Sequence, residues 1–180
     1  EIGIDLGLTN QLWCTDMDEP YSRENLTRTH EDALAMAQRA HKKRRVKAIH
    51  AKIANCRNDW AHKTTTAIVQ RARLIAVGNV SSPKLVKTRM AKSVLDAGWG
   101  QLRTCLEYKA KRLGVIYGEV NEAWSSVTCS ACLLKTGPRG LRALGVRVWV
   151  CTACGSLHSR DLNASRNILR QGRLGLPGIP

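Results

Sequence analysis

The first residues of the chain alternate between apolar and polar positions in the manner of a β-strand. In residues 1–7, EIGIDLG, the isoleucines and leucine fall on one side, whereas Asp5 and its flanking glycines fall on the other. Glycines inside a strand mark places where another part of the protein approaches closely. A second strand near Trp13 is expected to pair with the first as a hairpin.

A stretch without proline or glycine follows, from about Thr29 to Arg73. Apolar residues recur in it at roughly helical spacing, at Leu34, Ala37, Ala40, Ile49, Ile53 and Ile68. This pattern predicts one long helix or two consecutive helices.

The middle of the chain has the pattern of a strand followed by a helix. The apolar run at 74–80, LIAVGNV, predicts a buried strand. A helix is expected to begin at Ser82, a suitable N-cap, and Pro83, and to stop at Gly114. The Gly-Trp-Gly sequence at 98–100 is expected to divide this helix.

The next strand is predicted at 115–124, VIYGEVNEAW. Strand alternation puts Ile116, Val120 and Glu122 on one face and Glu119 on the other. Residues 125–158 hold two cysteine pairs and separate this strand from the last helix.

The last helix is predicted from SRDLNASRNILRQG, which begins at Ser159. Asp161, Ala164 and Ile168 share one stripe of this helix. The glycine- and proline-rich end, 172–180, is expected to be disordered. The alternation of strands and helices predicts an α/β fold, a mixed sheet with helices packed on it.

The net charge of the chain indicates the kind of partner that it binds. The chain of 180 residues carries a formal charge of +15 and has a pI of about 10.0, which favours a polyanion such as nucleic acid. Aromatic residues make up only 4%, with no phenylalanine, so stacking of bases on an aromatic platform is disfavoured. No apolar run approaches the length of a membrane span, and we expect a soluble intracellular protein.

Positive charge is concentrated between Ala33 and Asn58, a segment without a single acid. Its basic residues are Arg39, Lys42, Lys43, Arg44, Arg45, Lys47, Lys52 and Arg57. Solvent-exposed helices usually mix charges of both signs, so this segment favours contact with nucleic-acid phosphates over a merely soluble surface.

Two CxxC pairs carry the strongest chemical signal in the chain. Cys129 and Cys132 in CSAC, with Cys151 and Cys154 in CTAC, predict four thiolates around one structural Zn²⁺. The alternative of redox dithiols is disfavoured because neither pair opens a helix after a strand. A short hairpin is expected between the two pairs.

Asp5 and Asp161 are the candidate catalytic carboxylates. Each alone has an ordinary explanation, as a loop cap or as an acid in the first turn of a helix. Together, pointing inward from a mixed sheet in a basic chain, they have the character of a two-metal phosphodiesterase site. Such a site needs a third carboxylate.

Four segments in order resemble the TnpB family of transposon-encoded, RNA-guided DNA nucleases. They are GIDLG, the basic helix ending NCRNDWAHK, VTCSAC…WVCTACG and HSRDLNASRNIL. The resemblance implies an RNase H-like (RuvC) core interrupted by a zinc ribbon, with DNA and guide RNA as partners and no membrane. It also implies Zn²⁺ in a structural role, two catalytic Mg²⁺ ions, and a location in the bacterial or archaeal cytoplasm near the nucleoid.

The resemblance sets domain boundaries as well. The RuvC-like core is expected at 1–124, with its basic helix at about 29–73, the zinc ribbon at 125–158 and the closing helix at 159–171. The guide-binding half of such proteins would lie before Glu1, so the chain is expected to be the C-terminal part of a longer polypeptide. The fragment alone is expected to be inactive, and its oligomeric state is left open.

The chain departs from the family at one catalytic position. Most members carry a Glu at the end of the strand that matches LIAVGNV, where this chain has Gly78 and Asn79. Glu122, at the end of the neighbouring predicted strand, is expected to supply the missing ligand, as in related lineages with a relocated Glu. Asp5, Glu122 and Asp161 are therefore the predicted Mg²⁺ ligands.

Two other functions compete with RNA-guided cleavage. Simple loss of the second acid would leave a nuclease-dead nucleic-acid binder of the same fold. A strand-transfer transposase would use the same carboxylates, but the resemblance disfavours it because a zinc ribbon before the last helix belongs to the RNA-guided group.

A few residues near the predicted sites have no single interpretation. Asn163 and Arg166 suit either ligand orientation or an ordinary helix surface, and His62 and His158 suggest nothing beyond a phosphate contact or a loop hydrogen bond. Three arginines of the cysteine module suit either nucleic-acid contact or a charged surface: Arg139, Arg142 and Arg147.

Overall fold

The computed structural model describes most of the chain. The described residues are 1–8, 11–17, 19–22, 26–79, 97–140, 143 and 145–176. The predicted helix start at Ser82 and Pro83 lies outside the described residues, as do Arg142 and the last four positions of the chain.

The described residues form six β-strands and five α-helices. In chain order they are β1 (Ile2–Asp5), β2 (Trp13–Cys14), α1 (Leu26–Thr29), α2 (Glu31–Arg39), α3 (Lys43–Gln70), β3 (Leu74–Gly78), α6 (Trp99–Leu113), β4 (Ile116–Val120), β5 (Val148–Val150), β6 (Leu157–Ser159) and α7 (Arg160–Gly175).

The main sheet is mixed, as the sequence predicts. Its strand order is β2-β1-β3-β4; β1, β3 and β4 run parallel, and β2 returns antiparallel to β1. Parallel strands put their carboxyl ends at the same edge, so β1, β3 and β4 all end together. Strands β5 and β6 form a separate antiparallel pair.

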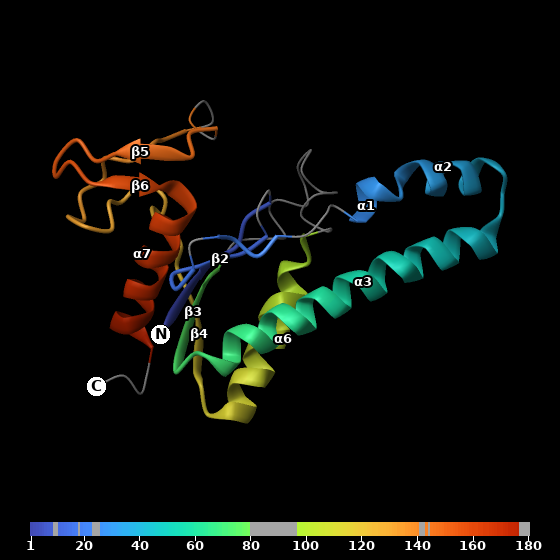
Figure 1. Cartoon of the computed structure of the whole chain (residues 1–180), viewed down its shortest axis with the longest axis horizontal. Coiled ribbons are helices and arrows are strands. Elements are labelled where there is room, and N and C mark those ends of the chain that lie inside the picture. Colours follow the sequence, from blue (N-terminus) through green and yellow to red (C-terminus); the bar gives the residue numbers. More distant parts are fainter. Residues whose placement is uncertain are drawn as a thin grey trace.

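Helices cover both faces of the main sheet (Figure 1). On one face, Ile4 and Ile75 pack with Ile68 of α3 and Leu106 of α6. On the other face, Leu74 and Ala76 of β3 and Val120 of β4 pack against α7. The α7 residues in this contact are Ile168 and Leu169. Strand alternation divides the sheet residues between these two cores, so β1 and β3 are buried on both sides, whereas β4 is only partly buried.

The basic segment forms an arm (Figure 1). Of the two predicted arrangements, the structure has two consecutive helices, α2 and α3. They are separated at Ala40–Lys42, where His41 has a φ of 50°. The C-terminal part of α3 packs on the core through Ala61, Ile68 and Val69. Its N-terminal part runs beside α2, beyond the sheet.

Three predicted boundaries are wrong. The strand predicted at 115–124 ends at Val120, and Glu122 lies in the loop that follows. The sequence predicts the short hairpin between the two cysteine pairs. In the structure β5 pairs with β6, so the hairpin encloses the second cysteine pair instead. The predicted disordered tail is helical as far as Gly175, and Leu176 packs against Gly118.

None of the helices that the structure describes has the length and apolar character needed to cross a membrane.

Helix α7 lies unusually close to β1, and Gly3 makes this approach possible. A Cβ at Gly3 would overlap the Ser165 carbonyl oxygen and lie 2.6 Å from the Leu169 Cβ. These are parts of helix α7 that cannot move without moving the helix. The spacing matters for function because α7 carries Asp161.

We expect Gly3→Ala to lower the free energy of unfolding by about 3 kcal/mol, the upper end of the cost of overpacking a core. Urea denaturation would measure it. Gly100→Ala is the matched control, because a Cβ there meets nothing within 4 Å. Equal effects of the two substitutions would contradict the close packing of α7 on β1.

Candidate active site and metal centre

The carboxyl ends of the three parallel strands place the candidate acids. Ile4 pairs with Val77, and Gly78 pairs with Val120. The residue after Ile4, Asp5, therefore lies level with Gly78 in the next strand. Gly3 faces α7, as its contacts with Ser165 and Leu169 indicate, and strand alternation gives Asp5 the same direction.

Glu122 reaches the carboxyl ends of β1 and β3 from the loop after β4. Its carboxylate folds back over Gly78, so that a Cβ at Gly78 would lie 2.7 Å from Glu122 Oε2 and 3.2 Å from Glu122 Cβ. The same Cβ would lie 3.0 Å from Ile168 Cδ1 of α7, which identifies the face. The Glu122 side chain thus occupies the space above the end of β3, next to the end of β1.

Glu119 points to the opposite face. Its carboxylate pairs with the Arg103 guanidinium of α6 at 3.2 Å. Among the acids of β4 and its following loop, only Glu122 is on the Asp5 side of the sheet.

Asp161 approaches from the first turn of α7. Arg147, just before β5, donates from Nη1 to both of its carboxylate oxygens, at 3.3 and 3.2 Å. The backbone N–H of Arg160 also donates to the Arg147 carbonyl at 2.7 Å. The start of α7 is therefore fixed to the cysteine module by side chain and backbone together.

The three acids are near enough to alter one another's ionisation. The pKa of Asp5 is raised to about 7, mainly by burial and further by the negative charges of Asp161 and Glu122, against the opposing effect of Arg160 and Arg147. Burial also raises the pKa of Glu122. Acids that repel one another in a partly buried site favour a cation between them.

The three carboxylates are less tightly gathered than the cysteines. Among the residues that the structure describes, only the four cysteines form a group of three or more His, Cys, Asp or Glu side chains whose ligand atoms all lie within 4.8 Å of one another. Carboxylate oxygens are the donors that hard divalent cations prefer, so the set suits Mg²⁺ in kind.

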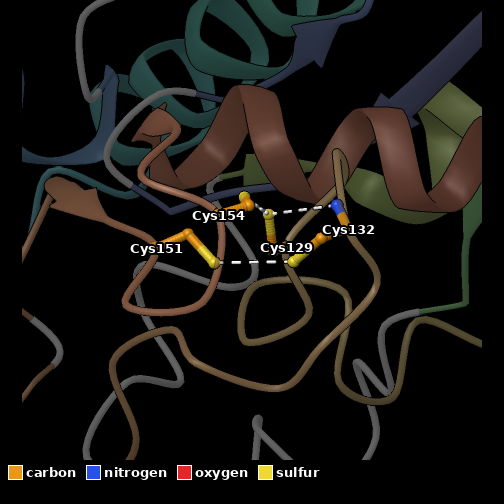
Figure 2. Close-up of side chains that lie close together, drawn as sticks. All are labelled: Cys129, Cys132, Cys151 and Cys154. Atoms are coloured by element: carbon orange, nitrogen blue, oxygen red, sulfur yellow. Dashed lines mark hydrogen bonds between the residues drawn. The ribbon is translucent and has the colours of Figure 1, made fainter.

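The four cysteine sulfurs form a compact cluster (Figure 2). Cys129 Sγ lies 3.7 Å from Cys154 Sγ, and Cys132 Sγ lies 3.6 Å from Cys151 Sγ. A tetrahedral site with Zn–S bonds of about 2.3 Å has edges of about 3.8 Å, whereas a disulfide is about 2.05 Å long. All four cysteines are free thiols, and the cluster is compatible with a zinc site.

Polar groups near two of the four cysteines favour the thiolate form that metal binding requires. A hydrogen bond with the Thr136 hydroxyl lowers the pKa of Cys151 to about 6. A hydrogen bond with the Ser156 side chain lowers the pKa of Cys154. Lowered thiol pKa values increase metal affinity at neutral pH.

His158 contacts the cysteine cluster, which the sequence analysis did not predict. Its buried ring lies on β6, with Nε2 3.0 Å from Cys129 Sγ and its centroid 4.7 Å from that of Trp149. Burial lowers the pKa of His158, with a smaller effect from Arg166, so the ring is neutral and suited to donate an N–H to the sulfur. Its pairing with Trp149 depends on a hairpin that the sequence pattern placed elsewhere.

Asn163 has a structural role in place of the surface or ligand roles considered from the sequence. It is buried, and its amide Nδ2 donates to the Ser125 and Thr128 carbonyls while its Oδ1 accepts the Ser130 N–H at 2.8 Å. Asn167, one turn later, donates to the same two carbonyls. These bonds attach α7 to the loop that leads into the first cysteine pair.

The basic residues lie away from the carboxylates. They occupy the arm formed by α2 and α3, and all of them are exposed except Arg57, which is half-buried: Arg39, Lys42, Lys43, Arg44, Arg45, Lys47, Lys52 and Arg57. Arg166 is exposed on α7, and His62 of α3 contacts the Tyr108 hydroxyl at 3.3 Å. The structure therefore separates these eight basic residues from the three carboxylates, whereas Arg147 of the cysteine module contacts Asp161.

The chain is similar in sequence to known proteins. The family described as "Cas12f1-like, TNB domain" matches residues 99–168. A "Putative RNA-guided DNA endonuclease" from Streptomyces pristinaespiralis is 33% identical over 188 residues, covering 95% of this chain and 45% of that protein. InsQ of Escherichia coli (strain K12), also described as a "Putative RNA-guided DNA endonuclease", is 31% identical over 146 residues. The match covers 72% of this chain and 36% of InsQ.

The fold agrees with this relationship. A cryo-EM structure of a Cas12f1–sgRNA–target DNA complex matches with a TM-score of 0.64 and 18% identity, covering 93% of this chain and 48% of that chain. The chain belongs to the TnpB family. It spans less than half the length of the two curated relatives described above.

We expect the purified chain to contain one zinc ion, measured by elemental analysis, and Cys132→Ser to lose it. The substitution should lower the Tm by more than about 5 °C, since metal-binding free energy contributes to folding. Cys56→Ser, at an exposed position of α3, should change neither zinc content nor Tm. Full zinc occupancy in the Cys132→Ser variant would contradict a four-cysteine site.

The ionisation of Asp5 predicts a pH-dependent stability in buffer free of divalent ions. The folded state binds this proton more tightly than the unfolded state, where the pKa is near 3.8, so the Asp5 contribution to the unfolding free energy falls as pH rises from about 4 to 7. Asp5→Asn should therefore stabilise the chain at pH 8 and have less effect at pH 5.

Denaturation of Asp5→Asn and of Asp59→Asn at both pH values would test this expectation. Asp59 is exposed and pairs with Lys63 one turn away, so its substitution should show little pH dependence. A destabilising effect of Asp5→Asn at pH 8 would contradict the burial of an ionised carboxylate.

Proposed function

We propose that this chain is the nuclease half of an RNA-guided, Mg²⁺-dependent DNA endonuclease of the TnpB type. The observation that carries the proposal is the placement of Asp5, Glu122 and Asp161 at one edge of the sheet, although they are far apart in sequence. Acids that only form structural ion pairs need not lie together on one side of the sheet. A two-metal phosphodiesterase site requires several carboxylates to lie close together.

The proposed fold is an RNase H-like, RuvC-type core with an inserted zinc ribbon. The core comprises residues 1–124 together with the closing helix from 159, and the ribbon comprises 125–158. Support comes from α7, which follows the ribbon in sequence but packs on β1, β3 and β4 (Figure 1). In this arrangement the zinc ribbon has a structural role, because all four metal positions are filled by protein.

The protein's task in catalysis is to hold the carboxylates in place. Two Mg²⁺ ions bound by them would supply an activated water and stabilise the departing 3′ oxygen. Asp5 is fixed by the register of β1, Glu122 by its position over Gly78, and Asp161 by the start of α7. Arg147 neutralises part of their charge through its contact with Asp161.

Nucleic acid would bind along the basic arm. Exposed cations on α2 and α3, without acids between Ala33 and Asn58, suit repeated contacts with phosphates. The proposed partners are target DNA and a guide RNA. Phosphate contacts of this kind are independent of sequence, so recognition of the target falls to base pairing with the guide.

A nuclease-dead binder of the same fold is the main competing function. It would keep the arm and the zinc ribbon but would have no reason to bury a carboxylate beside Asp5. The position of the Glu122 side chain over Gly78 favours the nuclease. No observation on the described residues favours a strand-transfer transposase.

Glu122→Gln in the full-length protein, assembled with its guide RNA, separates these functions. We expect Mg²⁺-dependent cleavage to fall by more than about 100-fold, since even residues outside the ligand shell of a metal contribute about 10- to 100-fold. Binding to target DNA should be unchanged. Cleavage gels and filter binding would measure the two activities.

Glu119→Gln is the matched control, because Glu119 lies on β4 close to Glu122 in sequence but faces Arg103 on the opposite side of the sheet. Its cleavage should stay within about threefold of the unmodified protein, as expected for a partly exposed ion pair. Normal cleavage by the Glu122→Gln variant would contradict the proposed role of Glu122.

A further inference from the structure

Gly78 has no backbone reason to be glycine. It is the last residue of β3, in the interior of the sheet between β1 and β4, and its φ is not in the left-handed region that favours glycine. Glycine in a strand costs about 0.5–1 kcal/mol relative to alanine, and buried strands favour branched or aromatic residues. The reason for glycine must therefore be space.

The space at Gly78 is filled by Glu122. Of the three atoms nearest to a Cβ placed on Gly78, two belong to Glu122, at 2.7 Å (Oε2) and 3.2 Å (Cβ), and one is Ile168 Cδ1, at 3.0 Å. A contact below 3.0 Å requires one of the groups to move. Because Glu122 reaches this point from a loop, its carboxylate would move first.

Asn79 holds the same loop from the other side. Its side-chain Oδ1 accepts the backbone N–H of Glu122 at 3.3 Å, and its own backbone N–H donates to the Val120 carbonyl at 2.9 Å. The two bonds span the turn from the end of β4 to Glu122. Asn79 thereby fixes the backbone from which the Glu122 side chain extends.

We propose that Gly78 and Asn79 are positioning residues for Glu122. Gly78 provides a slot without a side chain in which the Glu122 carboxylate lies beside Asp5, and Asn79 fixes the loop that directs it there. The lack of an acid at the end of β3 is then a structural requirement of the site. This inference rests on the proposed role of Glu122 in metal binding.

A stability experiment tests the slot without reference to catalysis. Gly78→Ala should lower the Tm by at least about 4 °C when Glu122 is present, and by less than half as much in a Glu122→Ala background, where the competing side chain is gone. Gly100→Ala, a site with nothing within 4 Å, should show the same small effect in both backgrounds. Equal losses from Gly78→Ala in both backgrounds would overturn the slot and assign the glycine to Ile168.

Metal binding tests the consequence for the site. Titration with Mn²⁺, followed by electron paramagnetic resonance, should show at least about 10-fold weaker binding for Gly78→Ala, the effect typical of residues that orient metal ligands. Asn79→Ala adds no atoms and should weaken Mn²⁺ binding in the same direction, while Asn79→Asp, which keeps the acceptor oxygen, should bind more tightly than Asn79→Ala. Unchanged Mn²⁺ affinity in Gly78→Ala and Asn79→Ala would overturn the proposal.

The full-length protein with its guide RNA distinguishes this inference from the proposed function. If Glu122→Gln abolishes cleavage while Gly78→Ala and Asn79→Ala cleave normally, the positioning roles are wrong and the function of Glu122 stands. If Glu122→Gln itself cleaves normally, the proposed function is wrong, and the paired stability measurement still decides whether Gly78 accommodates Glu122. We expect cleavage to fall about 10- to 100-fold for Gly78→Ala and less for Asn79→Ala.

Discussion

The parallel register of β1, β3 and β4 is the constraint on which the candidate site depends. It brings Asp5 level with Gly78 and ends all three strands at the same edge, so that Glu122 can fold back toward Asp5 from the loop after β4. A shift of one residue in β1 would turn Asp5 into the opposite core, among Ile4 and Ile75. The two-sided burial of β1 and β3 protects the register, because each face of these strands carries its own apolar residues.

The cysteine module supports the same edge of the sheet from outside. It holds α7 through the Asn163 and Asn167 amides, and it contacts Asp161 directly through Arg147. Metal binding by the four thiols would therefore stabilise the position of an acid that is not one of its ligands. This explains why the module is placed between the last strand of the core and the helix that completes it.

The sequence predicted the mixed sheet and the cysteine cluster because each follows from local spacing or from the order of strands and helices. The strand alternation used to orient Glu122 does not apply, because β4 ends at Val120 and Glu122 lies in the loop that follows. The assignment of Glu122 as a replacement ligand came from the family resemblance, and it remains a prediction. His158, Arg147 and the buried role of Asn163 were missed because they depend on contacts made after the chain folds. His158 meets Cys129 only through the β5–β6 hairpin, and Asn163 is buried only because a loop crosses α7. The end of α7 was misjudged because glycine and proline suggested disorder, whereas Gly172 allows close packing on Ala76.

The central claim is that three acids from distant parts of the chain converge on divalent ions. A crystal structure with Mn²⁺, with anomalous scattering used to locate the metal, tests this claim most directly. We expect metal density bounded by carboxylate oxygens of Asp5, Glu122 and Asp161, with Glu122 still lying over Gly78. Metal density that excludes Glu122, or a Glu122 side chain turned toward solvent, would contradict it.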